Sequence, residues 1–499
     1  MHFMTGVAGR FFSALGDAKI NVLAISQGSS ERNISAVVGM SESTRALRAV
    51  HAAFRLSTTT VRVGIIGMND IGISLLKLLE TQRNKLRKSF EIELQVCAVM
   101  NDGDSSEVVT LKKNALGGDG NESITSLVYD TISGGSSLFG ASATSSVSFQ
   151  NIASEIAEIE KGGLDTFNDF VFSADSTNSV IFDCTADEKI GKKHVDWLKH
   201  GTNVVTANSS ALAGDVETRD EIRKVEGEKK ASYLREVTVG GGLPVISTLR
   251  DLLNSGDQIR RLDGILSVTM SYVMHRIAPP PGNFECNNFD ELSTKGAYVR
   301  DFSISPSSHG TLSKPCSFRQ AMKEAAVLGL SEEDPIKDLN NEYTAQCLMV
   351  LARELGMDAK YDVKRIQSLS ESLIQQDGQS YSDIENDLDL AMKTRVEEAA
   401  ANGCVPRHVF SIDVKTCEIS IKIINVPQTH VFAMLPPSCE CVRFFTRRYK
   451  TFPLVIQGPS AGPDSTASAL LADLLNLMRR KEGSRPGELS RTNSLLLNN

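Results

Sequence analysis

A glycine-bounded turn between an apolar strand and an amphipathic helix constrains the fold of this chain most strongly. Residues 61–66 form a short apolar run, and the hexapeptide GMNDIG follows at residues 67–72. Beyond it, Ile71, Leu75 and Leu78 recur at helical spacing. A strand, a turn resembling G-x-G-x-x-G and a helix are typical of the first unit of a dinucleotide-binding Rossmann domain.

The turn departs from that pattern at its middle position. The outer glycines, Gly67 and Gly72, allow the tight turn and the close packing of helix on strand. The middle glycine normally lets the backbone approach the pyrophosphate at the helix N-terminus. Here that position is Asn69, whose side chain occupies space that the phosphates need, and Asp70 adds an adverse charge. The sequence therefore predicts the Rossmann fold and leaves cofactor binding open.

Strands and helices alternate after the turn. Buried strands are predicted at residues 94–100, 179–184 and 203–206, and helices at 187–199 and 216–229. This alternation predicts an α/β fold with a parallel, doubly wound sheet.

Three polar segments interrupt or end this pattern. Residues 102–148 are rich in Ser, Gly, Asn and Asp, and residues 278–315 contain three consecutive prolines and stay polar. Both are predicted to be inserted surface loops. Residues 482–499 are predicted to be a disordered tail.

The first part of the chain has a pattern of its own. A helix end at 11–15, strands at 18–26 and 33–38, and a helix at 41–54 precede a polar linker. About 50 residues are too few to bury a core, so this piece is predicted to belong to a larger unit.

The charge and composition of the chain disfavour several classes of binding partner. The net charge of −8 disfavours nucleic acid and anionic membranes, which need a basic face. The sequence has no apolar run long enough to span a membrane. The nine cysteines match no zinc or thioredoxin spacing and indicate free thiols in a reducing compartment. The first residues do not look like a targeting peptide, and cytoplasm and plastid both remain open.

Longer segments resemble a known family. Residues 21–35 and 46–51 resemble the last ACT unit of an aspartokinase. Six further segments, in the family's order, resemble homoserine dehydrogenases: 183–185, 204–208, 239–246, 264–267, 334–339 and 458–467. The chain is identified as a member of that family, similar to the C-terminal part of a bifunctional aspartokinase–homoserine dehydrogenase.

The resemblance implies an architecture and a reaction. It implies a partial ACT (ferredoxin-like) unit at 1–57 and a Rossmann NAD(P)-binding domain at 58–208 with a returning segment at 440–478. It also implies an α+β catalytic and dimerisation domain at 209–439, with a mostly antiparallel sheet, before the tail at 479–499. The implied activity is NAD(P)H-dependent reduction of aspartate semialdehyde to homoserine, in threonine, methionine and isoleucine biosynthesis.

Several positions that carry the family's chemistry hold other residue types. Ser209 replaces a lysine close to cofactor and substrate, and Cys347 replaces the lysine proposed as proton donor. Tyr343 replaces a substrate-binding aspartate. Asn341 and Val268 replace glycines, the latter in the family's substrate strand. Since such groups each contribute roughly 10²–10⁴-fold in rate, losing both lysines predicts little activity.

Other family positions are retained. Glu332 and Asp338 match carboxylates that hold the substrate, and Thr269 and Tyr272 fit the family's substrate segment. The cofactor contacts implied by the resemblance and the turn are Gly67, Asn69, Ile71, Gly72, Asn101, Thr185, Asn208 and Gly462. If a cofactor binds, Asp102 is expected to favour NAD over NADP by accepting from a ribose hydroxyl; a solvated loop acid is the alternative.

The resemblance implies two further sites and a partner. Residues 236–243 resemble a loop that binds sodium through the backbone carbonyls of Glu236, Val239, Gly241 and Leu243. A glycine turn packed on the sheet is the alternative. Gln27 matches a residue that contacts the effector threonine, in a pocket that another ACT unit completes. A homodimer or larger homo-oligomer is expected, with an aspartokinase or ACT subunit as a further candidate partner.

Three interpretations remain open. The chain is an active homoserine dehydrogenase, or a non-catalytic relative that serves as a regulatory or scaffolding subunit. The third is a changed reductase in which Tyr343 or Cys347 exchanges the proton, which requires a neighbouring cation to tune the pKa.

Overall fold

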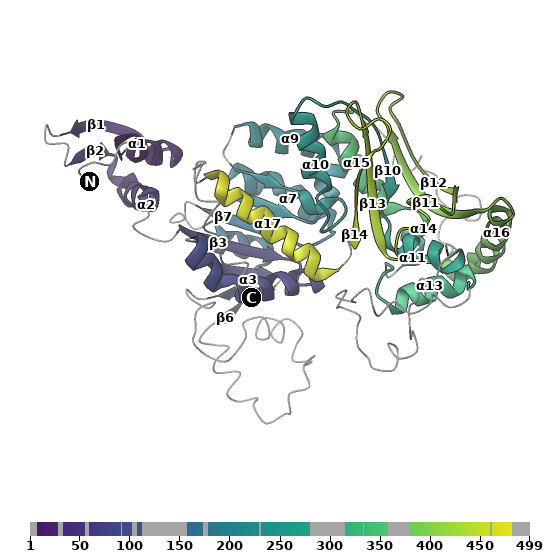
Figure 1. Ribbon diagram of the computed structural model, residues 1–499. Helices are drawn as coiled ribbons and strands as arrows, with labels where there is room; N and C mark the ends of the chain where they lie inside the picture. Colours follow the sequence, from purple (N-terminus) through teal and green to yellow (C-terminus); the bar gives the residue numbers. More distant parts are fainter. Residues whose placement is uncertain are drawn as a thin grey trace.

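The computed structural model describes residues 7–27, 33–54, 59–90, 92–101, 107–111, 157–172, 178–228, 231–279, 315–332, 334–357, 380–459 and 462–481. These residues form a short N-terminal unit, a seven-stranded sheet and a five-stranded sheet, as Figure 1 shows.

The seven-stranded sheet is the predicted doubly wound layer. Its strand order is β6-β5-β4-β3-β7-β8-β9, and β4, β3, β7, β8 and β9 run parallel. The strands are β3 (Thr59–Ile66), β4 (Ile92–Met100), β5 (Glu107–Leu111), β6 (Ala157–Lys161), β7 (Ser179–Asp183), β8 (Asn203–Thr206) and β9 (Tyr233–Leu234). Every residue of β7 and β8 is buried, as parallel strands covered on both faces require.

Helices cover both faces of this sheet. One face carries α3 (Asp70–Phe90) and α17 (Pro463–Lys481), which pack on each other through leucines such as Leu75, Leu79 and Leu470. The short helix η3 (Glu236–Thr238) joins this first core through Val237. The second core contains residues of α6 (Gly163–Val171), α7 (Glu188–Lys199), α8 (Ser210–Ala213), α9 (Val216–Gly227), α10 (Val245–Asn254) and α15 (Glu342–Glu354). Asp187 and Asp215 cap α7 and α9 through backbone N–H groups.

The five-stranded sheet is antiparallel, as predicted for the second domain. Its order is β12-β11-β10-β13-β14. One face joins the core of α10 and α15, and the other packs on α11, α13 and α16. The elements are β10 (Ile259–Ile265), α11 (Val268–Ile277), α13 (Phe318–Val327), α14 (Pro335–Leu339), α16 (Tyr381–Ala401), β11 (Cys404–Asp413), β12 (Glu418–Pro427), β13 (Cys439–Thr446) and β14 (Leu454–Pro459).

The N-terminal unit consists of two helices on a two-stranded antiparallel sheet. Leu15, Ile20 and Ala46 form its small core. Its elements are α1 (Val7–Asp17), β1 (Val22–Gln27), β2 (Ile34–Val38), η1 (Met40–Glu42) and α2 (Ser43–Ala53). In Figure 1 it stands apart from both larger sheets.

Two expectations from the sequence were wrong. The segment at 102–148, predicted to be all loop, contains β5, because Val108, Val109 and Leu111 bury their side chains beside β4. Val268, expected in a strand, begins helix α11, because the Ser267 side chain caps that helix by accepting from the Met270 N–H.

Other structural facts bear on the expected boundaries. The sheet continues beyond residue 208, since β9 pairs with β8. The segment at 440–478 was expected to return to the Rossmann domain. Its helix α17 packs on α3, whereas its strands β13 and β14 belong to the five-stranded sheet. Most of residues 102–148, residues 280–314 and the tail at 482–499 lie outside the described residues. Within the described part of the chain, no helix combines the length and apolarity needed to cross a membrane.

We predict that Gly64→Ala destabilises the seven-stranded sheet. A Cβ at Gly64 would lie 2.6 Å from both Phe167 Cζ and Val171 Cγ2, so α6 would have to move. Overpacking of this kind costs about 1–3 kcal/mol of unfolding free energy. Chemical denaturation of the variant measures the loss. The control is Gly227→Ala, where a Cβ meets nothing within 4 Å. Equal unfolding free energies for the two variants would contradict the packing described.

Candidate functional site

The turn between β3 and α3 needs both of its outer glycines. Gly67 has φ +90°, and a Cβ there would lie 2.8 Å from Thr185 Cγ2. A Cβ at Gly72 would lie 2.0 Å from the Gly67 carbonyl oxygen. The turn is anchored to β4 by a hydrogen bond of 3.0 Å from Gly67 N–H to the Met100 carbonyl. The dinucleotide-type turn therefore persists around the substituted middle position.

Asn69 occupies the N-terminus of α3. Its Oδ1 accepts from the N–H groups of Ile71 (3.0 Å) and Gly72 (3.2 Å). Its Nδ2 donates to the Cys184 carbonyl at 2.8 Å. The Asn69 side chain thus engages two amides at the place where a pyrophosphate would meet the helix.

A buried carboxylate joins the ends of β7 and β8 beside this turn. Asp183 Oδ1 accepts from Thr185 N (2.8 Å) and Thr185 Oγ1 (2.7 Å), and Oδ2 accepts from Asn208 Nδ2 at 3.0 Å. His194 Nε2 lies 2.8 Å from Oδ2, and its Nδ1 lies 2.9 Å from the Tyr233 hydroxyl. These contacts fix Thr185 and Asn208 at the carboxyl edge of the sheet, where α/β proteins bind ligands. In the sequence, Asp183 stands out only as part of a family motif, and no pattern marks His194 or Tyr233 as its partners.

Ser209 follows Asn208 directly and contacts α15. Its hydroxyl donates to Gln346 Oε1 at 2.7 Å, and Ser209 itself is buried. Gln346 precedes Cys347, whose thiol donates to the Thr238 carbonyl at 3.6 Å. Two neighbouring residues of α15 thus make these contacts, Gln346 with Ser209 and Cys347 with Thr238. Sequence reasoning missed Gln346, although its place beside Cys347 in an apolar helix was a usable signal.

Tyr343 lies one helical turn before Cys347 and shares its surroundings. The neighbouring Cys347 thiol and the Glu440 carboxylate hold the pKa of Tyr343 above its ordinary value, although Tyr343 is 42% exposed. Burial and Glu440 raise the pKa of Cys347 to about 12. Neither group is ionised at neutral pH. Among the described residues, no lysine or arginine hydrogen-bonds to Ser209, Tyr343 or Cys347.

Asn341 begins α15 in a left-handed conformation. Its φ and ψ are 60° and 27°, and its Oδ1 lies 2.7 Å from His408 Nε2. Asparagine tolerates this conformation better than most residues, which explains how it stands where the family has glycine.

Asp338 and Thr269 form a second polar cluster. Thr269 Oγ1 contacts Asp338 Oδ1 at 2.9 Å and the Leu330 carbonyl at 2.7 Å, and Glu332 N–H donates to Asp338 Oδ2 at 3.0 Å. Burial, with Glu332 nearby, raises the pKa of Asp338 to about 6. Three of the predicted substrate residues therefore lie together.

Tyr272 is not in that cluster. Its hydroxyl donates to Glu324 Oε2 at 3.2 Å, and Arg276 binds the same carboxylate at 2.6 Å. The buried ion pair with α13 holds the tyrosine away from Asp338.

The predicted sodium loop is a compact turn. The Glu236 and Leu243 carbonyls accept from Val239 N–H and Val245 N–H, respectively. The Glu236 carboxylate accepts from Ser247 N–H at 2.8 Å, and burial raises its pKa. The described residues contain no cluster of three or more histidine, cysteine, aspartate or glutamate side chains that could hold a metal ion. Sodium bound by the backbone carbonyls, including that of Gly241, stays a prediction.

The remaining predicted residues are spread over several elements. Asn101 is exposed after β4, Gly462 precedes α17, and Gln27 ends β1 opposite Ile34. Asp102 lies outside the described residues.

Family models match three parts of the chain. The homoserine dehydrogenase model matches residues 244–475, its NAD-binding domain model matches 141–236, and an ACT domain model matches 1–54. The ACT match covers the described part of the N-terminal unit, and the other two matches cover most of residues 141–475.

Curated proteins and solved structures agree with these models. Bifunctional aspartokinase/homoserine dehydrogenase 1, chloroplastic, of Arabidopsis thaliana is 33% identical over 95% of this chain and 45% of its own length. The chain thus spans about half the length of such relatives. A hyperthermophilic archaeal homoserine dehydrogenase in complex with NADPH has the same fold (TM-score 0.53, 16% identity, 85% of this chain and 98% of that one).

One relative is covered over most of its length. The homoserine dehydrogenase of Emericella nidulans is 32% identical over 60% of this chain and 76% of its own. With the family models and the fold, this match establishes that the chain belongs to the homoserine dehydrogenase family.

Proposed function

We propose that the protein is a homoserine dehydrogenase-type oxidoreductase that reduces aspartate semialdehyde with NAD(P)H at a strongly reduced rate. The supporting observation is the pair of contacts on α15, where Gln346 meets Ser209 and Cys347 contacts Thr238. The framework for two ligands is present, but the positions that would move a proton hold neutral groups.

The residues at the turn fit a dinucleotide in part. Gly67 and Gly72 keep the backbone shape, and Thr185 and Asn208 stand at the carboxyl edge of β7 and β8. Asn69 must release the amides of α3 before a pyrophosphate binds there. When bound, the cofactor supplies the hydride.

The protein's own groups would bind the amino-acid substrate. Asp338, oriented by Thr269 and Glu332 N–H, has a carboxylate suited to a substrate ammonium. Ser209, Tyr343 and Cys347 are the candidates for delivering the proton that the carbonyl oxygen gains on reduction. The pKa values of Tyr343 and Cys347 are raised, and Ser209 has no group that titrates near neutral pH. All three residues are therefore poor proton donors at neutral pH.

A second candidate is a regulatory subunit that binds ligands without turnover. The neutral contacts at Ser209 and Cys347 favour it, since they stabilise the fold without offering charge. The relatives are named as bifunctional aspartokinases and the chain carries an ACT match, so its partner would be an aspartokinase-type subunit.

The test is a fluorescence titration with NADPH and NADH followed by an aspartate semialdehyde reduction assay. Binding with slow turnover is the expected result. Binding without any turnover favours the regulatory candidate. Absence of binding to either nucleotide would contradict both.

Asn69→Gly is expected to tighten NADPH binding and to lower stability. Glycine frees two amides for the pyrophosphate but removes the side-chain cap, a change that costs about a few tenths of a kcal/mol when glycine replaces a capping residue. Fluorescence titration and thermal melting measure the two effects. Asn69→Ser, which keeps a capping oxygen, is the control and should retain stability. An unchanged or higher dissociation constant in Asn69→Gly would show that Asn69 does not obstruct the cofactor.

Restoring the family's charged residues at three positions should raise the rate of aspartate semialdehyde reduction. The triple variant Ser209→Lys, Tyr343→Asp and Cys347→Lys is expected to raise kcat by about 100-fold or more, because proton-transfer groups contribute that much. Steady-state aspartate semialdehyde reduction measures it. Cys417→Lys adds a lysine at an exposed cysteine and serves as control. No gain in a folded, NADPH-binding triple variant would place the defect elsewhere.

Substrate binding should depend on pH near 6. The Asp338 carboxyl has its pKa raised to about 6, so its charged form is lost as pH falls through that value. We expect kcat/KM to fall below pH 6 because the ammonium loses its partner. Asp338→Asn should lower kcat/KM at pH 8 and abolish this limb of the profile. If the fall in kcat/KM below pH 6 persists in Asp338→Asn, a group other than Asp338 causes it.

A further inference from the structure

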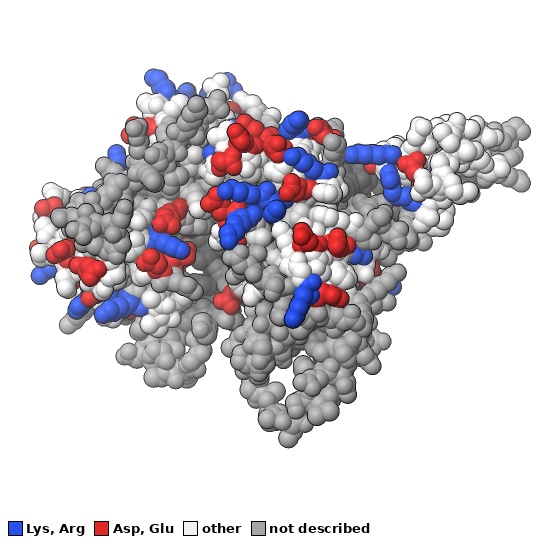
Figure 2. Space-filling model, turned by 180° about the vertical axis from the view of Figure 1, so that it is seen from behind, with Lys and Arg blue, Asp and Glu red and all other residues white. Residues whose placement is uncertain are grey.

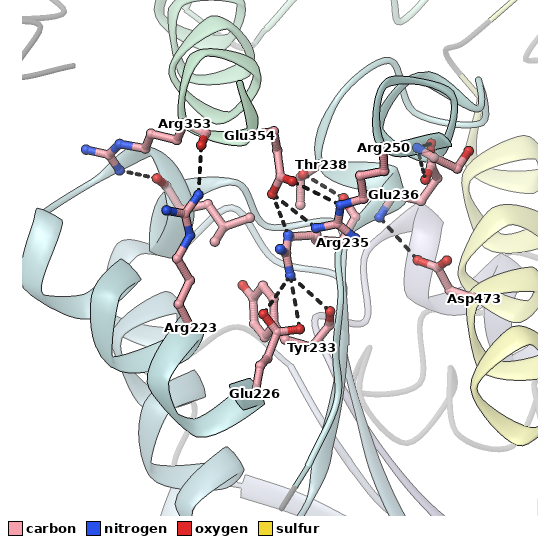
Figure 3. Close-up of polar contacts among 12 residues, drawn as sticks. Arg223, Glu226, Tyr233, Arg235, Glu236, Thr238, Arg250, Arg353, Glu354 and Asp473 are labelled. Carbon is pink, nitrogen blue, oxygen red and sulfur yellow. Dashed lines mark hydrogen bonds and ion pairs between the residues drawn. The ribbon is translucent and has the colours of Figure 1, made fainter. Parts of the chain in front are cut away.

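Helix α15 carries part of the candidate site, and ion pairs hold its C-terminal end. Glu354 binds Arg235 at 2.8 Å and Arg250 at 2.9 Å, and Figure 3 shows its carboxylate contacting both guanidinium groups. Arg353, the residue before it, donates to two backbone carbonyls at the end of α8. The C-terminal end of α15 is therefore fixed to the segments that follow β8 and β9.

The N-terminal end of α15 is held by a buried contact between neutral side chains. Acidic and basic side chains are interspersed on the face of the molecule that Figure 2 shows. Asn341 and His408, in contrast, are only 2% and 3% exposed. His408 Nε2 lies 2.7 Å from Asn341 Oδ1, and because an amide oxygen can only accept, the imidazole donates. Burial lowers the pKa of His408 to about 4, so the donor is a neutral imidazole at physiological pH.

Asn341 connects α14 to α15. Its N–H donates to the Asp338 carbonyl of α14 at 3.1 Å, and its own carbonyl accepts from Ala345 N–H of α15 at 2.8 Å. Its φ of 60° and ψ of 27° are left-handed, a conformation that is unfavourable for a residue with a Cβ. The hydrogen bond from His408 in this conformation favours it over the alternatives. The Asn341 backbone in turn sets the direction in which α14 lies relative to α15.

This turn places Asp338, which lies three residues before Asn341. The Asp338 carboxylate meets Thr269 Oγ1 and Glu332 N–H, and in the proposed function it holds the substrate ammonium. Since the far end of α15 is fixed, rotation about the Asn341 backbone would move α14 and its carboxylate relative to the helix. The hydrogen bond from His408 opposes that rotation and so couples β11 to the substrate-binding position.

We propose that His408 is a positioning residue: by donating to Asn341 it keeps the α14–α15 turn left-handed and holds Asp338 in place for the substrate ammonium. The inference rests on the proposed function for the identity of the substrate. His408 acts through Asn341 and not by contact with the substrate.

The test compares His408→Leu, which removes the donor, with His408→Gln, whose side-chain amide can donate in its place. KM for aspartate semialdehyde, kcat, the dissociation constant of homoserine by calorimetry and the melting temperature are measured for each. Loss of one buried hydrogen bond should raise KM and the dissociation constant about 10-fold in His408→Leu and change kcat less than about 2-fold. His408→Gln should recover most of the lost affinity.

Two further variants separate positioning from general destabilisation. Glycine adopts a left-handed conformation without side-chain support, so adding His408→Leu to Asn341→Gly should change KM less than about 2-fold. His430→Leu removes a half-buried imidazole of the same domain, which contacts Arg443 and the Phe432 N–H. It should lower the melting temperature and leave KM unchanged.

The inference and the proposed function fail in different ways. A wild-type protein that neither reduces aspartate semialdehyde nor binds homoserine would contradict the proposed function before any variant is made. With a wild type that binds homoserine, an unchanged dissociation constant in His408→Leu would overturn the inference. An equal loss of affinity from His408→Leu in the wild-type and Asn341→Gly backgrounds would overturn it as well, since His408 would then not act through Asn341.

Discussion

The buried carboxylate of Asp183 is the contact on which the site depends. It is fully buried, and four donor groups surround it: Thr185 N–H, Thr185 hydroxyl, Asn208 amide and His194 imidazole. Through Tyr233 the network reaches β9, so one side chain holds three adjacent strands in register at their carboxyl ends. Removing one partner from a buried, hydrogen-bonded charge of this kind typically costs about 3–5 kcal/mol. The position of Ser209 follows from this network, because it comes directly after Asn208.

The residues that shape the candidate site differ from the residues that would transfer a proton in it. The β3–α3 turn has the backbone shape of a dinucleotide-binding turn, and Asp338, Thr269 and the Glu332 N–H lie together. Ser209 with Gln346 and Cys347 with Thr238 form neutral contacts on α15. Ser209 and Cys347 are both buried, and neutral groups cost less to bury than unpaired charges. These contacts therefore stabilise α15 without a buried charge.

The sequence predicted what local pattern controls and missed what long-range contacts control. Apolar runs located β7 and β8 nearly to the residue, and the glycine spacing located the β3–α3 turn. The strand β5 was missed because its short apolar run lies within a polar segment. The helical start at Val268 depends on the Ser267 cap, and family position alone did not reveal it. Glu440 and the Asp183 network could not be found from spacing, since their partners lie far along the chain. That Asn69 caps α3 required coordinates, although its obstruction of the phosphate position was predicted.

A crystal structure of the wild-type protein with NADPH tests the central claim, that the dehydrogenase framework still accepts the cofactor despite its substituted positions. The account predicts the pyrophosphate at the N-terminus of α3. It also predicts that the Asn69 side chain is withdrawn from Ile71 and Gly72, and that the Ser209–Gln346 contact is intact. Nucleotide bound elsewhere, with Asn69 still on both amides, would contradict it.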